Sequence, residues 1–201
     1  MEKSLLIATG NPGKIREFNA LLASLPIQVL DTLALSLDLD IPEVGHTYRE
    51  NALIKARAYA EESGLVVLAD DSGLEVDALE GEPGLHSARY APQADATDAD
   101  RRRYLLSKLD GLPQPWTAHF HCTAVLMTPN GEVFTTNGQC PGIIIADERG
   151  DGGFGYDPIF YLPDHQATMA EIPVDLKNEI SHRARAVKAM LPYIHKVFNL
   201  Q

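Results

Sequence analysis

The residues best suited to chemistry are two adjacent aspartates, Asp70 and Asp71, which are followed by Ser72 and Gly73. They come directly after Leu65–Ala69, the most apolar strand that the sequence predicts. Ligands of α/β proteins gather at the carboxyl ends of strands, and consecutive strand side chains point to opposite sides. We therefore expect one carboxylate to coordinate magnesium or polarise water, while the other braces the turn. The alternative is an Asx turn that merely ends the strand.

A second candidate is the loop between the first apolar strand and the helical pattern that follows it. The loop consists of Thr9, Gly10, Asn11, Pro12, Gly13 and Lys14. Its asparagine stands at an N-cap position and its proline at the first helical position. A helix N-terminus offers backbone N–H groups and a partial positive charge, glycines allow close approach, and the lysine adds a full charge. The loop lacks the glycine spacing and the hydroxyl of a Walker A loop. It predicts phosphate binding, with an ordinary strand-to-helix turn as the alternative.

Three further groups could act with these segments. Glu43 is a carboxylate just before a predicted helix, or else a solvated loop acid. Phe154 lies between glycines, where its ring could stack on a base while Asp157 accepts hydrogen bonds from base N–H groups. The alternative is a tight loop with the ring in the core. His182 and Arg183 open the last helix and can donate to a carbonyl or a phosphate, or they are simply exposed first-turn residues.

The histidines of another segment tempt a metal interpretation. His119 and His121 share one face of a predicted strand, while Cys122 lies on the other face. No second ligand pair stands at zinc spacing in the sequence. We interpret them as strand residues.

The elements around these residues predict an α/β fold with a mixed sheet. Strands are expected before Thr9 and at Ile27–Leu30, Leu65–Ala69, Leu74–Ala78, Thr117–Met127, Glu132–Thr136 and Ile143–Ala146. Helices are expected from Pro12 onward, from a capping box at Thr47 to about Ser63, from a second box at Thr97 through Leu109, and from near Ser181 onward. Pro192 predicts a kink or a break in the last helix.

The composition sets the broad class of the protein. The chain has 201 residues, 45% of them hydrophobic, which suits one domain over 1–201. It has no apolar run of membrane-spanning length and no signal peptide, so a cytoplasmic location is the default. The net charge of −11 disfavours coating of nucleic acid, while surplus carboxylates suit a divalent metal. Two cysteines do not make a disulfide framework, so free thiols are expected.

Taken together and in order, the motifs of the chain are specific. They are Thr9–Lys14, Glu50-Asn51-Ala52 with Lys55, Ala69–Leu74, Pro83-Gly84 with Ser87–Tyr90, Gly152–Asp157 and Ser181–Ala184. Over nearly its whole length, the chain closely resembles the Ham1/inosine triphosphatase family.

The resemblance implies an enzyme that hydrolyses dITP, ITP and XTP to the monophosphate and pyrophosphate with Mg²⁺, keeping these nucleotides out of DNA and RNA. It implies a mixed, elongated, twisted sheet with flanking helices, two lobes around a central cleft, and a homodimer with neither nucleic acid nor membrane as a partner.

The resemblance also implies roles for individual residues. Asp71 would be the general base and a magnesium ligand, with Glu43 as a second ligand. The substrate-binding residues would be Thr9, Gly10, Asn11, Pro12, Gly13, Lys14, Lys55, Ser72, Phe154, Gly155, Tyr156, Asp157, Lys177, His182 and Arg183. The stretch from Phe154 to Asp157 would hold and read the base, together with Lys177, His182 and Arg183. Pro42 departs from the family pattern, because many relatives have an acid there.

Two other functions stay open at this point. One is a nucleotide pyrophosphatase of different base preference, similar to the Maf proteins. The other is a non-catalytic nucleotide sensor. Asp70, Asp71 and Lys14 argue against the sensor, while the segments Gly153–Asp157 and Ser181–Arg183 argue against the Maf-like enzyme.

Overall fold

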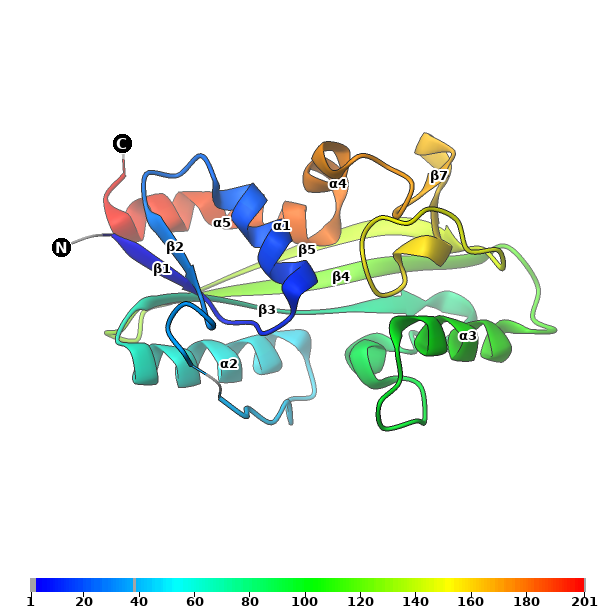
Figure 1. The fold of residues 1–201 in the computed structure, drawn as a ribbon, viewed down its shortest axis with the longest axis horizontal. Coiled ribbons are helices and arrows are strands. Elements are labelled where there is room, and N and C mark those ends of the chain that lie inside the picture. Colours follow the sequence, from blue (N-terminus) through cyan, green and yellow to red (C-terminus); the bar gives the residue numbers. More distant parts are fainter. Residues whose placement is uncertain (1–2, 38, 201) are drawn as a thin grey trace. The chain divides into compact units, whose positions relative to one another are not determined.

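The computed structural model describes residues 3–37 and 39–200 and shows a mixed α/β architecture. Seven strands form one sheet in the order β2-β1-β3-β4-β5-β6-β7, with helices flanking it (Figure 1). Strand β1 pairs in parallel with β2 and β3, whereas β6 pairs antiparallel with β5 and β7. The predicted fold class, an α/β fold with a mixed sheet and flanking helices, is confirmed.

The strands are β1 (Ser4–Ile7), β2 (Gln28–Asp31), β3 (Val66–Val76), β4 (Trp116–Met127), β5 (Val133–Ile144), β6 (Phe160–Leu162) and β7 (Ala167–Thr168). The α-helices are α1 (Pro12–Leu22), α2 (Tyr48–Ser63), α3 (Asp98–Leu109), α4 (Val174–Ile180) and α5 (His182–Phe198). Short 3₁₀ helices include η1 (Asp77–Leu79) and η2 (Gly84–Arg89).

The chain divides into two compact units. Unit 1 consists of the residues up to Asp71, Cys122–Gly138 and the residues from His182 onward. Unit 2 consists of Ser72–His121 and Gln139–Ser181. The chain therefore passes from one unit to the other within β3, β4 and β5, and once more between α4 and α5.

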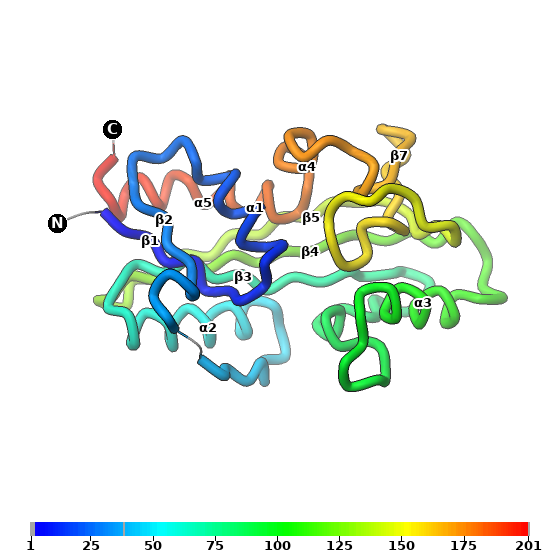
Figure 2. The backbone as a smooth tube through the Cα atoms, viewed as in Figure 1, coloured from blue at the N-terminus to red at the C-terminus, as the bar shows by residue number. Residues whose placement is uncertain are grey.

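Unit 1 is layered, with helices on both sides of its strands. Helices α1 and α5 pack on one side, where Leu68 of β3 contacts their apolar residues, and α2 packs on the other side against Val67 and Ala69 (Figure 1). The β1 strand and the end of α5 lie near each other in the chain trace, where Lys3 Nζ donates to the carbonyl of Asn199 at 3.3 Å (Figure 2). Each side chain of β3 in unit 1 therefore faces one of two different helix layers.

Unit 2 buries one face of its strands in a core, and the other face of β3 and β4 carries polar side chains. The core gathers Leu74 from β3, Phe120 from β4 and Leu105 from α3. On the other face, His119 Nε2 lies 2.9 Å from Glu75 Oε2, and both side chains are half-buried. His119 and His121 lie within β4 while Cys122 is fully buried, so their interpretation as strand residues is confirmed.

Two predicted boundaries are wrong. The strand that begins near Leu65 does not end at Asp70 but continues as β3 to Val76. Asp70 can lie within a strand because its charge is neutralised by cations that are distant in the sequence but close in space. Local preferences for strands and turns carry no information about such ion pairs. The strands predicted at Glu132–Thr136 and Ile143–Ala146 correspond to one strand, β5, which ends at Ile144. Helix α5 continues through Pro192. Of the two outcomes predicted there, a kink or a break, the break is therefore excluded.

Within residues 3–37 and 39–200, the helices are too short or too polar for any of them to span a lipid bilayer.

Candidate functional site

Strand β3 places Asp70 and Asp71 on opposite faces of the sheet in unit 1. Asp70 shares its face with Leu68, on the side of α1 and α5, whereas Asp71 shares its face with Ala69, on the side of α2. Both carboxylates are buried, with exposed fractions of 0% for Asp70 and 6% for Asp71. Two adjacent residues of the same type therefore lie in two different environments.

On the first face, Asp70 is enclosed by cations. Its Oδ2 lies 3.0 Å from Lys14 Nζ and accepts from Arg183 Nη2 at 3.0 Å and Nε at 3.2 Å. Burial alone would raise the pKa of this carboxyl, but Lys14, Arg183 and Lys55 outweigh it and hold the pKa well below its usual range. Asp70 is therefore a permanent counter-charge at the centre of an ion-pair network.

The network extends to α1 through Arg183. Its remaining nitrogen, Nη1, donates to Glu17 Oε2, and the guanidinium carbon lies 5.8 Å from the centre of the Phe18 ring. The Arg183 side chain is only 1% exposed. Arg183 therefore ties α5 to α1 and β3, and its donors point to carboxylates of unit 1.

On the second face, Asp71 contacts two polar residues of α2. Its Oδ2 accepts from Asn51 Nδ2 at 3.0 Å, and its Oδ1 lies 3.8 Å from Lys55 Nζ. Burial raises the pKa of Asp71, because Lys55 and Lys14 offset the cost of desolvation only in part and Glu43 adds repulsion. A buried carboxylate with a raised pKa beside a lysine has the properties of a general base.

Glu43 completes this second face. Its Oε1 lies 2.8 Å from Lys55 Nζ, so one ammonium contacts both carboxylates. Burial alone would lower the pKa of Lys55, but Asp70, Asp71 and Glu43 together raise it. The loop that carries Glu43 is held to α2 by a hydrogen bond of 2.8 Å from Gly45 N–H to Asn51 Oδ1.

The loop from Thr9 to Lys14 forms the predicted helix cap. Asn11 is the N-cap residue of α1, and its Oδ1 accepts from Gly13 N at 2.8 Å and from Lys14 N at 3.2 Å. The cap therefore already satisfies two of the backbone N–H groups that this helix start was expected to offer to a phosphate. Burial lowers the pKa of the Lys14 amine, with Asp70 opposing. The ammonium of Lys14 and the polar side chains of Thr9 and Asn11 remain as groups for an anion.

Unit 2 holds a second polar cluster, formed by Phe154, Asp157 and Lys177. Asp157 Oδ2 accepts from Lys177 Nζ at 2.6 Å and from Phe154 N at 2.8 Å. The Lys177 ammonium also lies 5.1 Å from the centre of the Phe154 ring, a cation–π distance. Asp157 and Lys177 are buried, while Phe154 is half-buried. We refer to these three residues as the aromatic cluster.

Comparison with known proteins assigns the chain to a family. The model of the Ham1 family matches residues 5–193, which include both polar clusters. The chain belongs to the Ham1 family.

Members of the Ham1 family are similar to this chain over nearly their full length. A Desulforamulus reducens relative named dITP/XTP pyrophosphatase is 43% identical over 195 residues, 96% of each chain. One from Geobacillus kaustophilus with the same name is 47% identical over 92% of this chain and 91% of its own. The solved structure of a HAM1 protein from Coxiella burnetii superposes with a TM-score of 0.86 at 41% identity, covering 98% of this chain and all of its own.

The structure groups the predicted site residues of this Ham1 family member in two places. Unit 1 contains Thr9–Lys14, Glu43, Lys55, Asp71, His182 and Arg183, and unit 2 contains Ser72, Phe154–Asp157 and Lys177. His182 and Arg183, predicted to hold the base together with Phe154–Asp157 and Lys177, belong to unit 1, which also contains Asp70. Both are buried rather than exposed first-turn residues.

Tyr156, another predicted site residue, packs into the core of unit 2. Its side chain is 4% exposed, and its hydroxyl donates to the carbonyl of Ser87 at 2.9 Å. Burial also raises the pKa of this phenol above its usual range. Tyr156 therefore holds the segment that carries Phe154 against η2.

Asn51 is the residue that the predicted site lacks. It lies on α2 and is 1% exposed. Its Nδ2 donates to Asp71 and its Oδ1 accepts from the loop that carries Glu43, so it links the two. A signal was present in the sequence, because Asn51 stands four residues before Lys55 and the two therefore share a helix face.

The donor set around Lys55 fits a divalent cation. Asp71 and Glu43 both contact the same ammonium, so a cation bound between these carboxylates would have two oxygen ligands from the protein. Magnesium is commonly bound by one or two carboxylates together with substrate phosphates and water. Within residues 3–37 and 39–200, no three His, Cys, Asp or Glu side chains are grouped as a metal site.

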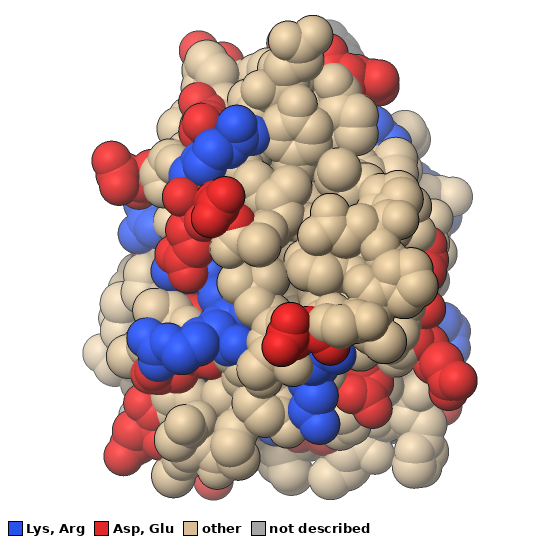
Figure 3. Space-filling view, turned by 90° about the vertical axis from the view of Figure 1, so that its right-hand side faces the viewer, with Lys and Arg blue, Asp and Glu red and all other residues tan. Residues whose placement is uncertain are grey.

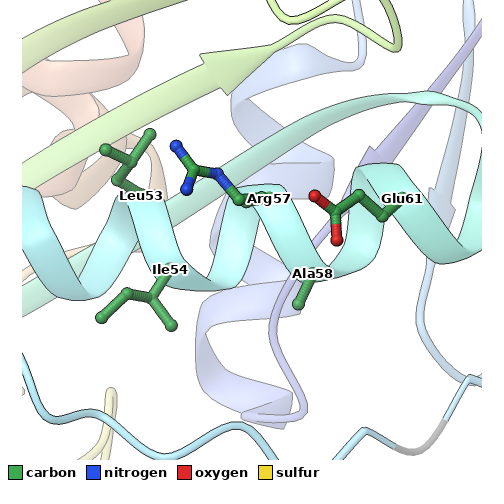
Figure 4. Close-up of a pocket in the computed structure, with 5 residues that line it drawn as sticks. All are labelled: Leu53, Ile54, Arg57, Ala58 and Glu61. Carbon is green, nitrogen blue, oxygen red and sulfur yellow. The ribbon is translucent and has the colours of Figure 1, made fainter.

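Other surface features lie outside these clusters. A shallow hollow over α2 is lined by residues of that helix alone, among them Leu53, Arg57 and Glu61 (Figure 4). Both acidic and basic side chains reach the face shown in Figure 3, which is therefore not of uniform sign. Neither Asp70 nor Asp71 is among the residues that line the hollow.

Proposed function

We propose that this Ham1 family member is a nucleoside-triphosphate pyrophosphatase that hydrolyses dITP, ITP and XTP to the monophosphate and pyrophosphate. The observation that carries the proposal is the arrangement of Asp71, a buried carboxylate of raised pKa that is held by Asn51 and faces Lys55. The names of the relatives supply the substrate class, since they are dITP/XTP pyrophosphatases.

The cations of unit 1 would hold the triphosphate. Lys14 and Lys55 supply two positive charges, and Thr9 and Asn11 supply polar side chains at the start of α1. Charge neutralisation and positioning make up most of the catalysis of phosphoryl transfer. Both lysines are held by carboxylates before substrate arrives, so their ammonium groups are already in place.

We assign the bound metal to Asp71 and Glu43, with Mg²⁺ as the ion. When bound, it would offset the charge of the phosphates as a Lewis acid. Asp71 would orient, or remove a proton from, the water that attacks the α-phosphorus. Its raised pKa makes it a stronger base than an exposed aspartate.

The aromatic cluster would take the base. The Phe154 ring offers a stacking surface, and the Lys177 ammonium offers a donor to the 6-keto oxygen that inosine and xanthosine have and adenosine lacks. A mismatched buried donor costs enough free energy to give strong discrimination. His182 remains a proposed donor, whereas we now assign Arg183 to Asp70 and Glu17.

Two further properties rest on the family alone. We propose that the protein is a homodimer and that it acts in the cytoplasm. Light scattering on the purified protein would measure the mass of the assembly, and a monomer would contradict the first of these.

The decisive experiment measures pyrophosphate release from dITP, XTP, GTP, ATP and dTTP, with and without Mg²⁺. We expect release from dITP and XTP that depends on the metal, and little from ATP. A preference for dTTP would instead favour a Maf-like enzyme, and binding without release from any nucleotide would favour a sensor.

A further inference from the structure

Helix α3 holds the backbone of Gly155 at both of its polar groups. The Gly155 N–H donates to Asp98 Oδ2 at 2.8 Å, and the Gly155 carbonyl accepts from Arg102 Nη1 at 2.8 Å. Asp98 and Arg102 stand four residues apart on α3, so they lie on the same face of the helix. All three residues belong to unit 2. We refer to this pair of contacts as the α3 clamp.

The clamped residue lies inside the segment that carries the aromatic cluster. Gly155 follows Phe154 directly and has a φ of 61°, which other residues adopt only with strain. On the opposite side of Phe154, Gly153 approaches Asp157 so closely that a Cβ there would lie 2.0 Å from its Oδ2. Two attachments therefore fix the peptide units on either side of the Phe154 ring: the Asp157 carboxylate and the α3 clamp.

Both contacts of the clamp involve charged side chains, which form stronger hydrogen bonds than neutral groups do. Arg102 is held in place in turn, because its Nη2 lies 2.8 Å from Glu148 Oε2 and its side chain is only 12% exposed. Its fork-shaped guanidinium thus joins a backbone carbonyl and a carboxylate at the same time. Arg102, the less exposed member of the clamp, is therefore held on two sides.

Capping of the helix does not explain the role of Asp98. Thr97 and Asp100 already form a reciprocal capping box at the start of α3. Asp98 also contacts Arg101 through its other oxygen, Oδ1, which leaves the contact of Oδ2 with Gly155 separate from both. Loss of the Asp98 carboxylate should therefore release Gly155 while the helix cap remains.

We propose that Asp98 and Arg102 are positioning residues for base selection. By fixing Gly155, they set the orientation of the Phe154 ring and the position of Asp157. In the proposed function, these two residues form the site that binds the base. The inference rests on the proposed function, since it assigns the base to the aromatic cluster. It adds two residues of α3 to the specificity machinery, and neither of them touches the substrate.

The test compares Asp98→Ala and Arg102→Ala with a control variant of the same helix, Arg103→Ala. Arg103 is 76% exposed and pairs with Asp100, so the control removes an arginine without touching Gly155. We expect KM for dITP to rise about tenfold in the two clamp variants, as for loss of a hydrogen bond to a charged group, with kcat within about threefold. The constant for inhibition by inorganic pyrophosphate, which has no base, should stay within about twofold of wild type.

Conservative variants separate positioning from general damage. Asp98→Asn keeps an oxygen that can accept from Gly155 and should restore most of the wild-type KM. Arg102→Lys keeps one donor for the Gly155 carbonyl and should give an intermediate KM. These variants also provide the test if either alanine variant fails to fold.

Hydrogen exchange at the Gly155 amide reports on the clamp without any turnover. We expect exchange about tenfold faster in Asp98→Ala and near wild type in Asp98→Asn, in line with loss of one protecting hydrogen bond. Faster exchange with an unchanged KM for dITP would overturn the inference while the proposed function stands. A wild-type protein that releases no pyrophosphate from dITP would instead refute the proposed function, whatever the exchange rate at Gly155.

Discussion

The two faces of β3 in unit 1 carry the same residue type and give it opposite properties. Asp70 faces α1 and α5, where Lys14 and Arg183 lower its pKa. Asp71 faces α2, where an amide and a more distant ammonium leave burial as the dominant influence and the pKa is raised. Since both side chains are nearly fully buried, the difference comes from the neighbours that each face supplies.

In the proposed mechanism, one strand therefore holds a structural charge and a reactive charge side by side. Asp70 is paired with neighbouring cations that hold its pKa low, so it fixes Lys14 in place. Asp71 is less well neutralised, which leaves it available to a proton or to a metal. The alternation of the strand keeps the two tasks apart, although the residues are adjacent.

The largest effect is expected for Asp71→Asn, which removes the charge of the proposed general base and keeps the shape of the side chain. We expect kcat for dITP to fall by about 10³-fold, within the range for loss of a general base. The melting temperature should stay close to that of wild type, because an asparagine still bonds to Asn51 and relieves a desolvated charge. The measurement is pyrophosphate release by a folded variant, and near-wild-type kcat would remove Asp71 from the catalytic role.

A large effect of a different kind is expected for Asp70→Asn. Asparagine keeps an oxygen acceptor, but Lys14 and Arg183 lose their common counter-charge. Breaking a buried ion pair costs about 3–5 kcal/mol, so we expect the free energy of unfolding to fall by that amount in a urea titration. The matched variant Glu17→Gln should cost less, because Glu17 is more exposed than Asp70. Equal stability of Asp70→Asn and wild type would show that the network is not structural.

The pH dependence of stability should differ in sign between the two aspartates when metal is removed with EDTA. The lowered pKa of Asp70 gives stability that is complete above its unfolded value of 3.8 and is lost as the pH falls below it. The raised pKa of Asp71 gives stability that is present below that value and is lost as the pH rises through the folded pKa. Each pH unit between folded and unfolded pKa values is worth about 1.4 kcal/mol.

The difference in free energy of unfolding between Asp70→Asn and wild type should therefore shrink as the pH falls below 3.8. Asp71→Asn should gain stability relative to wild type as the pH rises above the same value. Urea titrations of the three proteins across this range measure both slopes. Slopes of the same sign would contradict the contrast between the two faces.

The smallest effect is expected for Gly10→Ala, which tests whether the loop from Thr9 to Lys14 binds phosphate. A Cβ at Gly10 would meet nothing within 4 Å, and its φ is not among the positive values, so the fold itself does not require glycine there. We expect an unchanged or slightly higher stability, by about 0.4–1 kcal/mol, and a KM for dITP raised by several-fold. Gly64→Ala is the control for a glycine that the fold does require. Gly64 is the C-cap of α2, and its φ of 66° makes alanine costly, so this variant should lose stability. An unchanged KM in Gly10→Ala would argue against close approach of phosphate at this residue.

Local patterns predicted most elements but missed what distant residues decide. The helix starts at Asn11, Thr47 and Thr97 follow from capping chemistry, and all three are N-caps in the structure. The continuation of β3 through Asp70 was not predictable in the same way. It depends on Arg183, which stands 113 residues farther along the chain.

The predicted site shows the same division. The sequence indicated the carboxylate and lysine of the Asp71 face, because each belongs to a recognisable motif. The partners of Arg183 are decided by tertiary packing, because its side chain donates to Asp70 and Glu17 within unit 1. Asp98 and Arg102 were not identifiable at all, because they bind the backbone of Gly155, and a backbone contact leaves no pattern in the side chains of its partner.

The most direct test of the account follows the oxygen of the attacking water. Hydrolysis of dITP in water enriched in ¹⁸O, followed by mass spectrometry of both products, identifies the phosphorus that is attacked. Attack at the α-phosphorus, next to a water held by Asp71, predicts label in the nucleoside monophosphate and none in pyrophosphate. Label in pyrophosphate, or in released inorganic phosphate, would contradict it.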